Sequence, residues 1–478
     1  MKNQDTQLYS MLGRSIRTIA SWIVLTVCIT LSLHNSLSGQ ERADVETSEV
    51  TVQPVLSQEL GIAQSQQQLF CLDGSEQSQE ELFAPPAAPE YFDLGDDSEC
   101  VFCNDRYPTG HLSGFLQIDS AGFDQSADSV TEFGVISNKT AVRRARLALI
   151  GDLAQDIGYK LDVDFAAAGH PSARDVFIDF NNHPIADRLV IGNTKVPFQL
   201  EALTSSKDFT FAERAPFFTF APFRQIGIWA DGSFQDEMGT WSIAGFRVGK
   251  GGFVLNHSDD GHGFAARSTA LHWYEDDGRY LLHTGINYSY IQPFDKFVRY
   301  DAKLSFFTNQ EPGIISPGVP LLVDTGKISA DGVNLFNYEL AGTIGWLNYQ
   351  SELTYALVDQ IGGPPLIFYG GYGQIGWFLT GESKPYNRKT GVYGSVVPDK
   401  NVIDGGLGAW ELALRGTYLN LNDKNIAGGR LKTMEFGLNW YLSQHLSMKF
   451  DYVRGLIKNS TTNNVAIRTF GARLQIIY

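Results

Sequence analysis

The chain has few methionines and cysteines and no excess of basic residues. Only 5 of its 478 residues are methionine and 4 are cysteine, and no long apolar helical pattern follows the N-terminal segment. Glycine (48), phenylalanine (31) and tyrosine (20) are instead abundant, which is typical of short strands and turns. The net charge of −16 is unlike that of a nucleic-acid-binding protein, so we expect no nucleic-acid partner.

The acidic charge is concentrated near the N-terminus. Residues 41–105 hold 15 acidic side chains against Arg42 alone, whereas residues 106–478 are close to neutral. The acidic stretch is also rich in glutamine and contains the run PPAAP at 85–89. This composition predicts a largely disordered periplasmic extension over residues 40–108.

The first 39 residues have the three parts of a secretory signal peptide. A basic region with Lys2 and two arginines precedes an apolar run from Ile19 to Leu33, and small residues follow from Ser36 to Gly39. The apolar run is too short to span a membrane comfortably. We therefore predict export and removal of residues 1–39.

Removal of the signal peptide leaves Cys71, Cys100 and Cys103. The spacing of Cys100 and Cys103 suits a disulfide in an oxidising compartment, and Cys71 with His111 would complete a metal-binding set. That set matches metal-ligand spacing poorly, so we predict no metal site and no cofactor.

From His111 onward, segments of about ten residues alternate apolar and polar side chains between turns, as in an outer-membrane β-barrel. The alternation is clearest in Ile157–Phe165, Phe297–Phe307 and Leu431–Leu442. A soluble β-sandwich would show the same period. Charges of both signs on the polar faces, such as Lys160 beside Asp162, favour a wall around a water-filled lumen.

About 17 segments between residues 111 and 478 qualify as strands, and bacterial single-chain barrels have an even number. We predict an all-β fold, an antiparallel transmembrane β-barrel of about 16 strands over residues 109–478. The segment most open to reassignment is 291–333. Aromatic residues near strand ends, among them Trp346, Trp377 and Tyr441, are expected to form girdles at the membrane interfaces.

The run from Gly192 to Arg224 interrupts this pattern. It has no clear period and contains three prolines and seven phenylalanines, together with Lys207, Arg214 and Arg224. A connection this long between barrel strands is more often functional than a passive linker. We expect it to fold into the lumen, with aromatic rings on the wall and cations facing water, and to narrow the pore. The alternative is an ordinary surface loop.

Four runs resemble the phosphate-selective porin O/P family, in the order in which that family has them: VRRARLALIGDLAQDIGYKLDVDFA (142–166), DVFIDFNN (175–182), IGNTKVPFQLEALTSSKDFTFAERA (191–215) and WFLTGESKPYNRKTGVYG (377–394). The resemblance spans most of residues 111–478. It implies a trimeric outer-membrane channel of 16 strands, whose third loop folds inward and whose arginines and lysines guide anions. The fourth run suggests no task of its own, and packing or loop folding is its plainer interpretation.

The resemblance draws attention to Arg143, Arg144 and Arg146 on the second strand and to Lys207 and Arg214 in the inward loop. Arginine presents a fixed fork of donors that suits phosphate oxygens. Strand alternation places Arg144 and Arg146 on one face and Arg143 on the other, unless a bulge intervenes.

The candidate site residues follow from these considerations. Arg144, Arg146 and Lys160 are predicted to line the lumen wall, and Lys207, Arg214 and Arg224 are predicted to act in the constriction loop. The alternative for the wall arginines is structural, since they would also pair with Asp162 and Asp164 on the adjacent strand.

The sequence thus predicts a passive channel for small hydrophilic solutes, with small anions such as phosphate among its permeants, in the outer membrane of a Gram-negative-type envelope. Its expected partners are outer-membrane lipid and two further copies in a homotrimer. One alternative is a structural protein that uses the acidic N-terminal segment as a tether. A barrel enzyme is a weaker alternative, since His257, His262, His272 and His283 belong to no recognised catalytic motif.

Overall fold

The computed structural model describes residues 107–166, 171–248, 261–293, 295–304, 306, 319–459 and 465–478. The predicted signal peptide, almost all of the predicted acidic extension and the four cysteines lie outside these residues. Their predicted roles therefore stay predictions.

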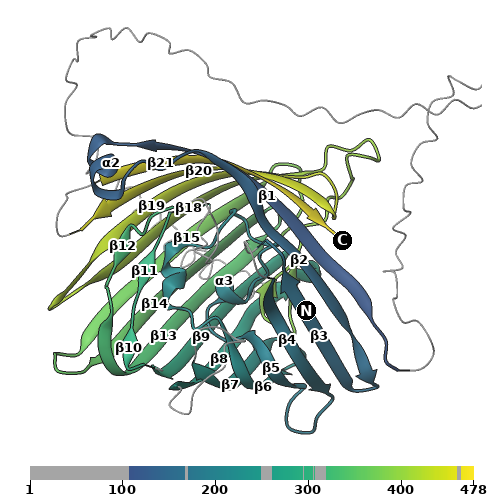
Figure 1. Ribbon diagram of the computed structural model, residues 1–478. Coiled ribbons are helices and arrows are strands. Elements are labelled where there is room, and N and C mark those ends of the chain that lie inside the picture. Colours follow the sequence, from purple (N-terminus) through teal and green to yellow (C-terminus); the bar gives the residue numbers. More distant parts are fainter. Residues whose placement is uncertain are drawn as a thin grey trace, which may run out of the picture. The chain divides into compact units, whose positions relative to one another are not determined.

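The described chain forms a closed barrel of sixteen antiparallel strands (Figure 1). Each strand pairs with the next along the chain, and β1 pairs with both β2 and β21, which closes the wall. The predicted fold class and strand number are confirmed. The wall strands are β1 (His111–Gln125), β2 (Lys139–Ala154), β3 (Ile157–Asp164), β4 (Ser172–Asn181), β5 (Arg188–Lys195), β6 (Arg224–Phe234), β7 (Gly239–Val248), β8 (Gly261–Glu275), β9 (Tyr280–Gln292), β13 (Ile328–Ile344), β14 (Leu347–Gln360), β15 (Leu366–Phe378), β18 (Ala409–Asp423), β19 (Ile426–Tyr441), β20 (Leu446–Lys458) and β21 (Val465–Ile477).

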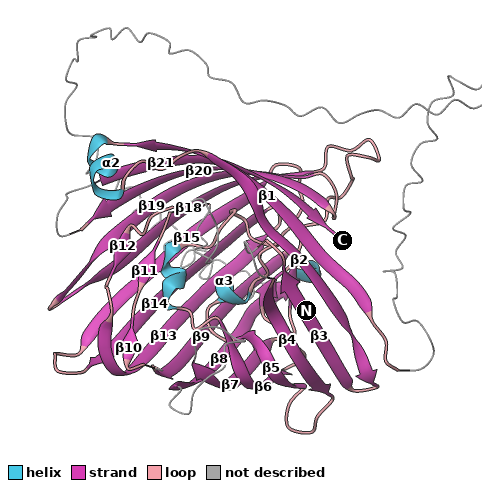
Figure 2. Ribbon diagram, in the orientation of Figure 1, coloured by secondary structure: helices cyan, strands magenta, loops and turns pink. Residues whose placement is uncertain are grey.

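Short elements occur in the connections between the wall strands (Figure 2). Those in the described residues are α2 (Ala127–Phe133), α3 (Leu200–Leu203), the 3-10 turns η1 (Pro216–Phe220) and η2 (Asp276–Gly278), and the two-residue strands β10 (Phe297–Val298), β11 (Asp301–Ala302), β12 (Val323–Asp324), β16 (Tyr386–Asn387) and β17 (Val392–Tyr393).

The two ends of the barrel differ in the length of their connections. One end, the short-turn end, carries the tight turns 155–156, 235–238 and 345–346 and the C-terminal end of β21. The opposite, long-loop end carries the connections 196–223 and 293–327. Segment 379–408 is the exception, because it is a long connection at the short-turn end.

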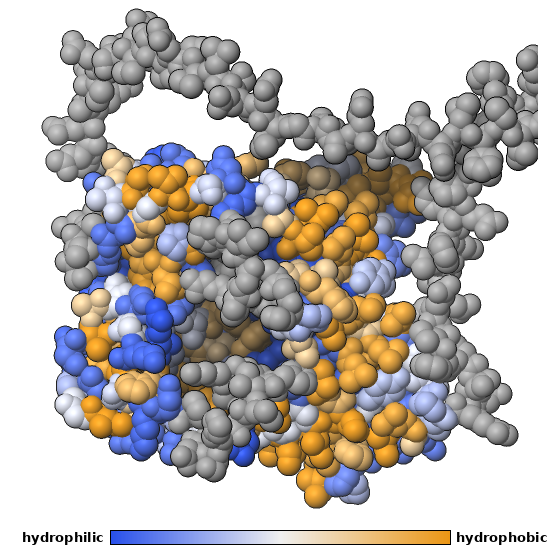
Figure 3. Space-filling model, in the orientation of Figure 1, coloured by the Kyte–Doolittle hydropathy of each residue, from blue (hydrophilic) through white to orange (hydrophobic). Residues whose placement is uncertain are grey.

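The predicted alternation of side chains is confirmed in the wall. On β3, Leu161 is 45% exposed on the outer face, whereas Asp162 and Asp164 are buried inside. On β19, Phe436 is 49% exposed and Glu435 is buried. Apolar residues accordingly form broad patches on the outer face of the wall (Figure 3). A period of two therefore gives each strand an apolar outside and a polar inside.

The predicted barrel strand over Phe297–Phe307 is wrong. Its described part contains only the two-residue strands β10 and β11, in the connection between β9 and β13. From Tyr300 onward the alternate apolar side chains are buried inside the barrel, where the ring of Tyr300 lies 5.0 Å from that of Phe220 in η1. The alternation thus reflects packing against the segment between β5 and β6 rather than contact with lipid.

Aromatic residues at the short-turn end lie on both sides of the wall. Trp346 and Trp377 are each 48% exposed on the outside, with ring centroids 5.5 Å apart. Tyr441, in contrast, points inward and donates a hydrogen bond of 3.0 Å to Glu411. Trp346 and Trp377 thus lie on the outer face, as expected for residues of an aromatic girdle at a membrane interface. The prediction that Tyr441 belongs to such a girdle is wrong.

A buried ion pair joins the two strands that close the barrel. Asp119 of β1 lies opposite Arg473 of β21, and the guanidinium donates two hydrogen bonds of 2.7 Å to the carboxylate. Both side chains are almost completely buried. A pair of this geometry fixes the register of the closing strands as well as their contact.

Arg473→Ala should destabilise the barrel by about 3–5 kcal/mol, because it leaves the Asp119 carboxylate buried without its partner. Urea unfolding in lipid vesicles, followed by tryptophan fluorescence, would measure the loss. The matched control is Arg468→Ala on the same strand, whose pair with Asp124 across the same seam is exposed. That control should cost no more than about 1 kcal/mol. Equal effects of the two substitutions would contradict this account of the seam.

Candidate functional site

The segment 196–223 between β5 and β6 folds into the lumen, as predicted (Figure 1). We call it the inward loop. β5 continues to Lys195, so the loop begins later than the sequence pattern indicates. Phe198, Phe211 and Phe217 of the loop are at most 1% exposed, and the ring of Phe217 lies 5.0 Å from that of Tyr372 on β15. Aromatic packing on the wall therefore holds the loop inside the barrel.

Carboxylates of the wall accept hydrogen bonds from the backbone of the inward loop. Glu352 of β14 accepts from the amides of Leu200 and Glu201, each at 2.8 Å. Asp451 of β20 accepts from the amide of Ala212, also at 2.8 Å. These bonds satisfy buried amides that no sheet partner reaches. The acids inside the barrel therefore serve partly to position the loop.

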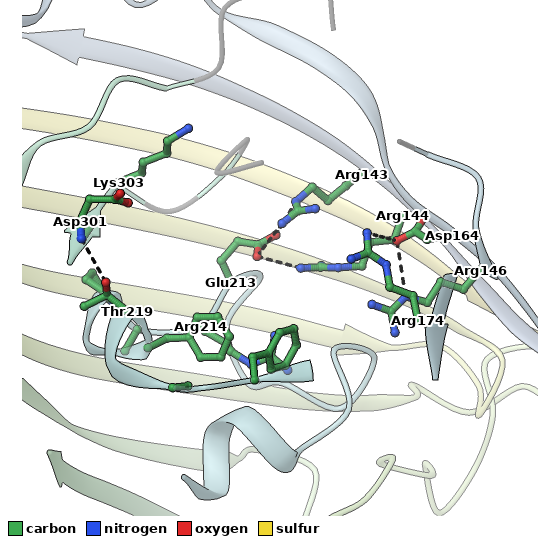
Figure 4. A pocket seen from close by; sticks show the side chains of 16 residues that line it. Arg143, Arg144, Arg146, Asp164, Arg174, Glu213, Arg214, Thr219, Asp301 and Lys303 are labelled. Carbon is green, nitrogen blue, oxygen red and sulfur yellow. Dashed lines mark hydrogen bonds and ion pairs between the residues drawn. The ribbon is translucent and has the colours of Figure 1, made fainter. Parts of the chain in front are cut away.

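Glu213 of the inward loop binds three arginines of the wall. Its carboxylate accepts from Arg143 at 2.8 and 3.1 Å, from Arg144 at 2.9 Å and from Arg473 at 2.8 Å. Figure 4 shows the carboxylate between Arg143 and Arg144. Burial would raise the pKa of Glu213, but the three guanidinium groups outweigh burial and hold that pKa well below its usual value. Glu213 is therefore ionised and ties the loop to β2 and β21.

A β-bulge brings Arg143 to the inner face of β2. Arg144 lies opposite Gln117, whereas Val142 lies opposite the next residue, Ile118, so Arg143 is an extra residue in β2. Arg143 and Arg144 are consequently both buried inside. Alternation alone would have placed Arg143 outside, and the bulge removes that restriction.

A cavity of about 460 Å³ lies between the inward loop and the wall formed by β2, β3 and β4. Six cationic side chains border it against three carboxylates. The cations are Arg143, Arg144, Arg146, Arg174, Arg214 and Lys303, and the carboxylates are Asp164, Glu213 and Asp301 (Figure 4). The local charge is therefore positive although the chain as a whole is acidic.

Arg146 and Arg174 have the longer ion pairs of this cavity. Arg146 lies 3.7 Å from Asp162 and 3.5 Å from Asp164, and Arg174 lies 3.4 Å from Asp164. The structural pairing that the sequence suggested for the wall arginines is therefore present for Arg146. Arg144 instead donates to Gln117 and Glu213.

Arg214 lines the same cavity, but its guanidinium also organises the loop. The group lies over the rings of Phe209, Phe218 and Phe223 at 4.4, 4.8 and 5.0 Å. It donates to the backbone carbonyl groups of Glu201, Ala202 and Thr204. Such a cage stabilises a cation and the turn around it.

The remaining predicted cations lie apart from this cavity lining. Arg224 is the first residue of β6 rather than part of the loop, and it pairs with Asp175 at 2.7 Å. Lys160 lies 3.5 Å from the same carboxylate. Lys207 borders a different, small cleft with Gln444 at the short-turn end. The structure thus brings Arg144, Arg146 and Arg214 to one cavity and places Lys160, Arg224 and Lys207 elsewhere.

The family model for phosphate-selective porins O and P matches residues 112–478. The chain belongs to this family. Porin O of Pseudomonas aeruginosa is 25% identical over 402 residues, which cover 76% of this chain and 86% of that protein. An uncharacterized protein of Caulobacter vibrioides is 28% identical over 327 residues, which cover 65% of this chain and only 62% of that relative's length.

Among solved structures, the anion-selective porin from Comamonas acidovorans aligns with a TM-score of 0.49 and 10% identity. The alignment covers 77% of this chain and 99% of that porin. Membership of the porin O and P family, together with the closed barrel, indicates an outer-membrane location. In the part of the chain that the structure describes, no helix has the length and apolar character needed to cross a membrane.

This porin-family chain has a second inward segment, 379–408, which the sequence analysis did not place. Lys384 donates to Thr210 of the inward loop at 2.5 Å, and Ser395 hydrogen-bonds Asp208. Tyr393 donates to the carbonyl of Gly342 on β13 at 3.1 Å. The run WFLTGESKPYNRKTGVYG therefore belongs largely to loop folding. In the sequence, the only indication of this second inward segment was the length of the connection 379–408, which is unusual for the short-turn end.

Two histidines considered for an enzyme lie on opposite faces of the wall. His283 is buried inside and hydrogen-bonds Tyr386 and Glu339, at 2.7 and 3.0 Å. His272 bonds Thr284 on the exposed face. His257 lies outside the described residues. His262, on β8 like His272, is exposed. His262, His272 and His283, the three described side chains, therefore do not meet in one catalytic set.

Glu213→Gln should increase anion preference. The amide keeps one of the two acceptor oxygens and turns its NH2 donor towards the guanidinium groups, so the loop should be held less tightly while the lumen loses one negative charge. One unit charge at a few Å in water is worth about 1 kcal/mol, so the ratio of chloride to potassium permeability should rise about fivefold. Reversal potentials in a planar bilayer under a potassium chloride gradient measure this ratio.

Asp128→Asn on the exposed helix α2 removes the same charge outside the lumen and should leave the ratio almost unchanged. A fall in the ratio for Glu213→Gln would contradict the role given to this carboxylate.

Proposed function

We propose that the protein is a passive diffusion channel for small hydrophilic solutes that prefers anions. The observation that supports this most is the cationic lining of the cavity beside the inward loop. Charged side chains at a constriction select the sign of the permeating ion. The short-turn end would face the periplasm, since short turns lie there in outer-membrane barrels.

The position of the charge matters more for this function than its total. At physiological ionic strength, exposed charges separated by more than about 8 Å are largely screened. The six cationic and three anionic side chains that border the cavity directly set the local field.

Phosphate is included among the proposed permeants on chemical grounds. The guanidinium fork matches two phosphate oxygens, and several such groups line one cavity. Family membership and the distant relationship to Porin O are consistent with this proposal. Assembly as a homotrimer in outer-membrane lipid, and export by the signal peptide, are proposed with it.

Arg146→Gln should weaken anion preference, because Asp162 and Asp164 would keep their charge while losing the guanidinium between them. The ratio of chloride to potassium permeability should fall about fivefold, as expected for one unit charge at a few Å. Reversal potentials of the refolded protein in a planar bilayer provide the measurement. Arg146→Lys keeps the charge and serves as the control.

Comparison of Arg146→Gln with Arg146→Lys distinguishes the effect of the lost charge from the effect of a changed side-chain shape. Retention of the wild-type ratio by Arg146→Lys, with loss in Arg146→Gln, supports selection by charge. A wild-type pore that prefers potassium would overturn the proposed anion preference and leave a general diffusion channel.

A further inference from the structure

The cavity beside the inward loop has an apolar side as well as a cationic one. Besides the charged groups, Pro216, Phe218 and Phe223 border it, together with three alanines. The rings of Phe218 and Phe223 meet edge to face, with centroids 4.9 Å apart. Phe218 is half-buried, so part of its surface faces the cavity. Apolar surface and cationic groups therefore border the same space.

The cavity is large for an inorganic anion. Its volume of about 460 Å³ lies within the range of small-molecule sites, roughly 300–1,000 Å³, which are lined mainly by apolar groups with a few polar ones that fix orientation. An inorganic phosphate would occupy a small part of this space. It would also leave the phenylalanine surface in contact with water, so the apolar side of the cavity would add nothing to the affinity for phosphate.

The cations differ in how firmly they are engaged. Arg143 and Arg144 hold Glu213 with short bonds of 2.8–3.1 Å. The contacts of Arg146 and Arg174 with Asp162 and Asp164 are 3.4–3.7 Å long. Longer contacts between charges are weaker. Among the arginines, Arg146 would thus lose little internal bonding on engaging a carboxylate, and the Lys303 ammonium on the same cavity, which has no hydrogen-bond acceptor among the described residues, would lose less still.

We propose that this cavity is a binding site for small organic anions in which a carboxylate is attached to an apolar ring. The carboxylate would meet Arg146 and Arg174, and the ring would lie on Phe218 and Phe223. This inference rests on the proposed anion-preferring channel and names its substrate class. It differs from a site for inorganic phosphate because the apolar side contributes to affinity.

The test compares sodium benzoate, sodium acetate and inorganic phosphate as blockers of the chloride current through the wild-type protein in a planar bilayer. Benzoate should halve the current at a concentration about tenfold lower than acetate, because only benzoate removes a ring from water. Phosphate should also require a higher concentration than benzoate. Equal potency of benzoate and acetate, or greater potency of phosphate, would overturn the inference.

Phe218→Ala should abolish the advantage of benzoate over acetate. Because Phe218 also packs against the Arg214 guanidinium, the ratio of chloride to potassium permeability is measured in the same variant to detect any displacement of the loop. Phe218→Leu keeps an apolar side chain and a packed loop, so it should retain part of the advantage of benzoate over acetate. This variant provides the test if Phe218→Ala does not fold. Phe264→Ala, on the outer face of β8, removes a phenyl group outside the lumen and should behave like the wild type. Full retention of the advantage in Phe218→Leu and in a folded Phe218→Ala would contradict the proposed ring contact.

Failure of the inference can be distinguished from failure of the proposed function. A wild-type pore that prefers chloride but responds equally to benzoate and acetate overturns only the inference. A pore that prefers potassium overturns the proposed anion preference, and the inference with it.

Discussion

The Glu213 carboxylate and the three arginines around it hold the parts of the lumen together. Arg143 and Arg144 come from β2 and Arg473 from β21, so one carboxylate of the inward loop connects the two strands that flank β1. Arg473 also binds Asp119 across the closing seam. Loop position and barrel closure therefore depend on one network of buried charges, in which removal of a single member leaves its partners unpaired.

The same network of ion pairs and hydrogen bonds explains why an excess of positive charge is found around one cavity inside the barrel. Most described acids inside the barrel are committed to loop amides or to arginines, as Glu352, Asp451 and Asp119 are. Between the loop and the strands β2 to β4, however, cations outnumber carboxylates around one cavity. An almost neutral barrel can thus present a cationic cavity, because the sign of the local field depends on the placement of a few side chains.

The barrel and its inward loop could be predicted from the sequence, because a period of two and a long aperiodic run are local patterns. The bulge at Arg143 could not, since it follows from the register between β1 and β2 rather than from the residue itself. The alternation in Phe297–Phe307 was misleading because packing inside the lumen imposes the same period as contact with lipid. Likewise, the ion pair between Glu213 and Arg473 could not be predicted, because the two residues are 260 positions apart and no local sequence pattern connects them.

Anions are expected to reside in the cavity between the inward loop and the arginines of β2 and β4. This can be tested with a crystal of the folded protein soaked in sodium bromide, by measuring anomalous diffraction at the bromine edge. A bromide peak is expected in the cavity, within contact distance of Arg146 or Arg174. A map with bromide bound elsewhere in the lumen, and none in this cavity, would contradict this expectation.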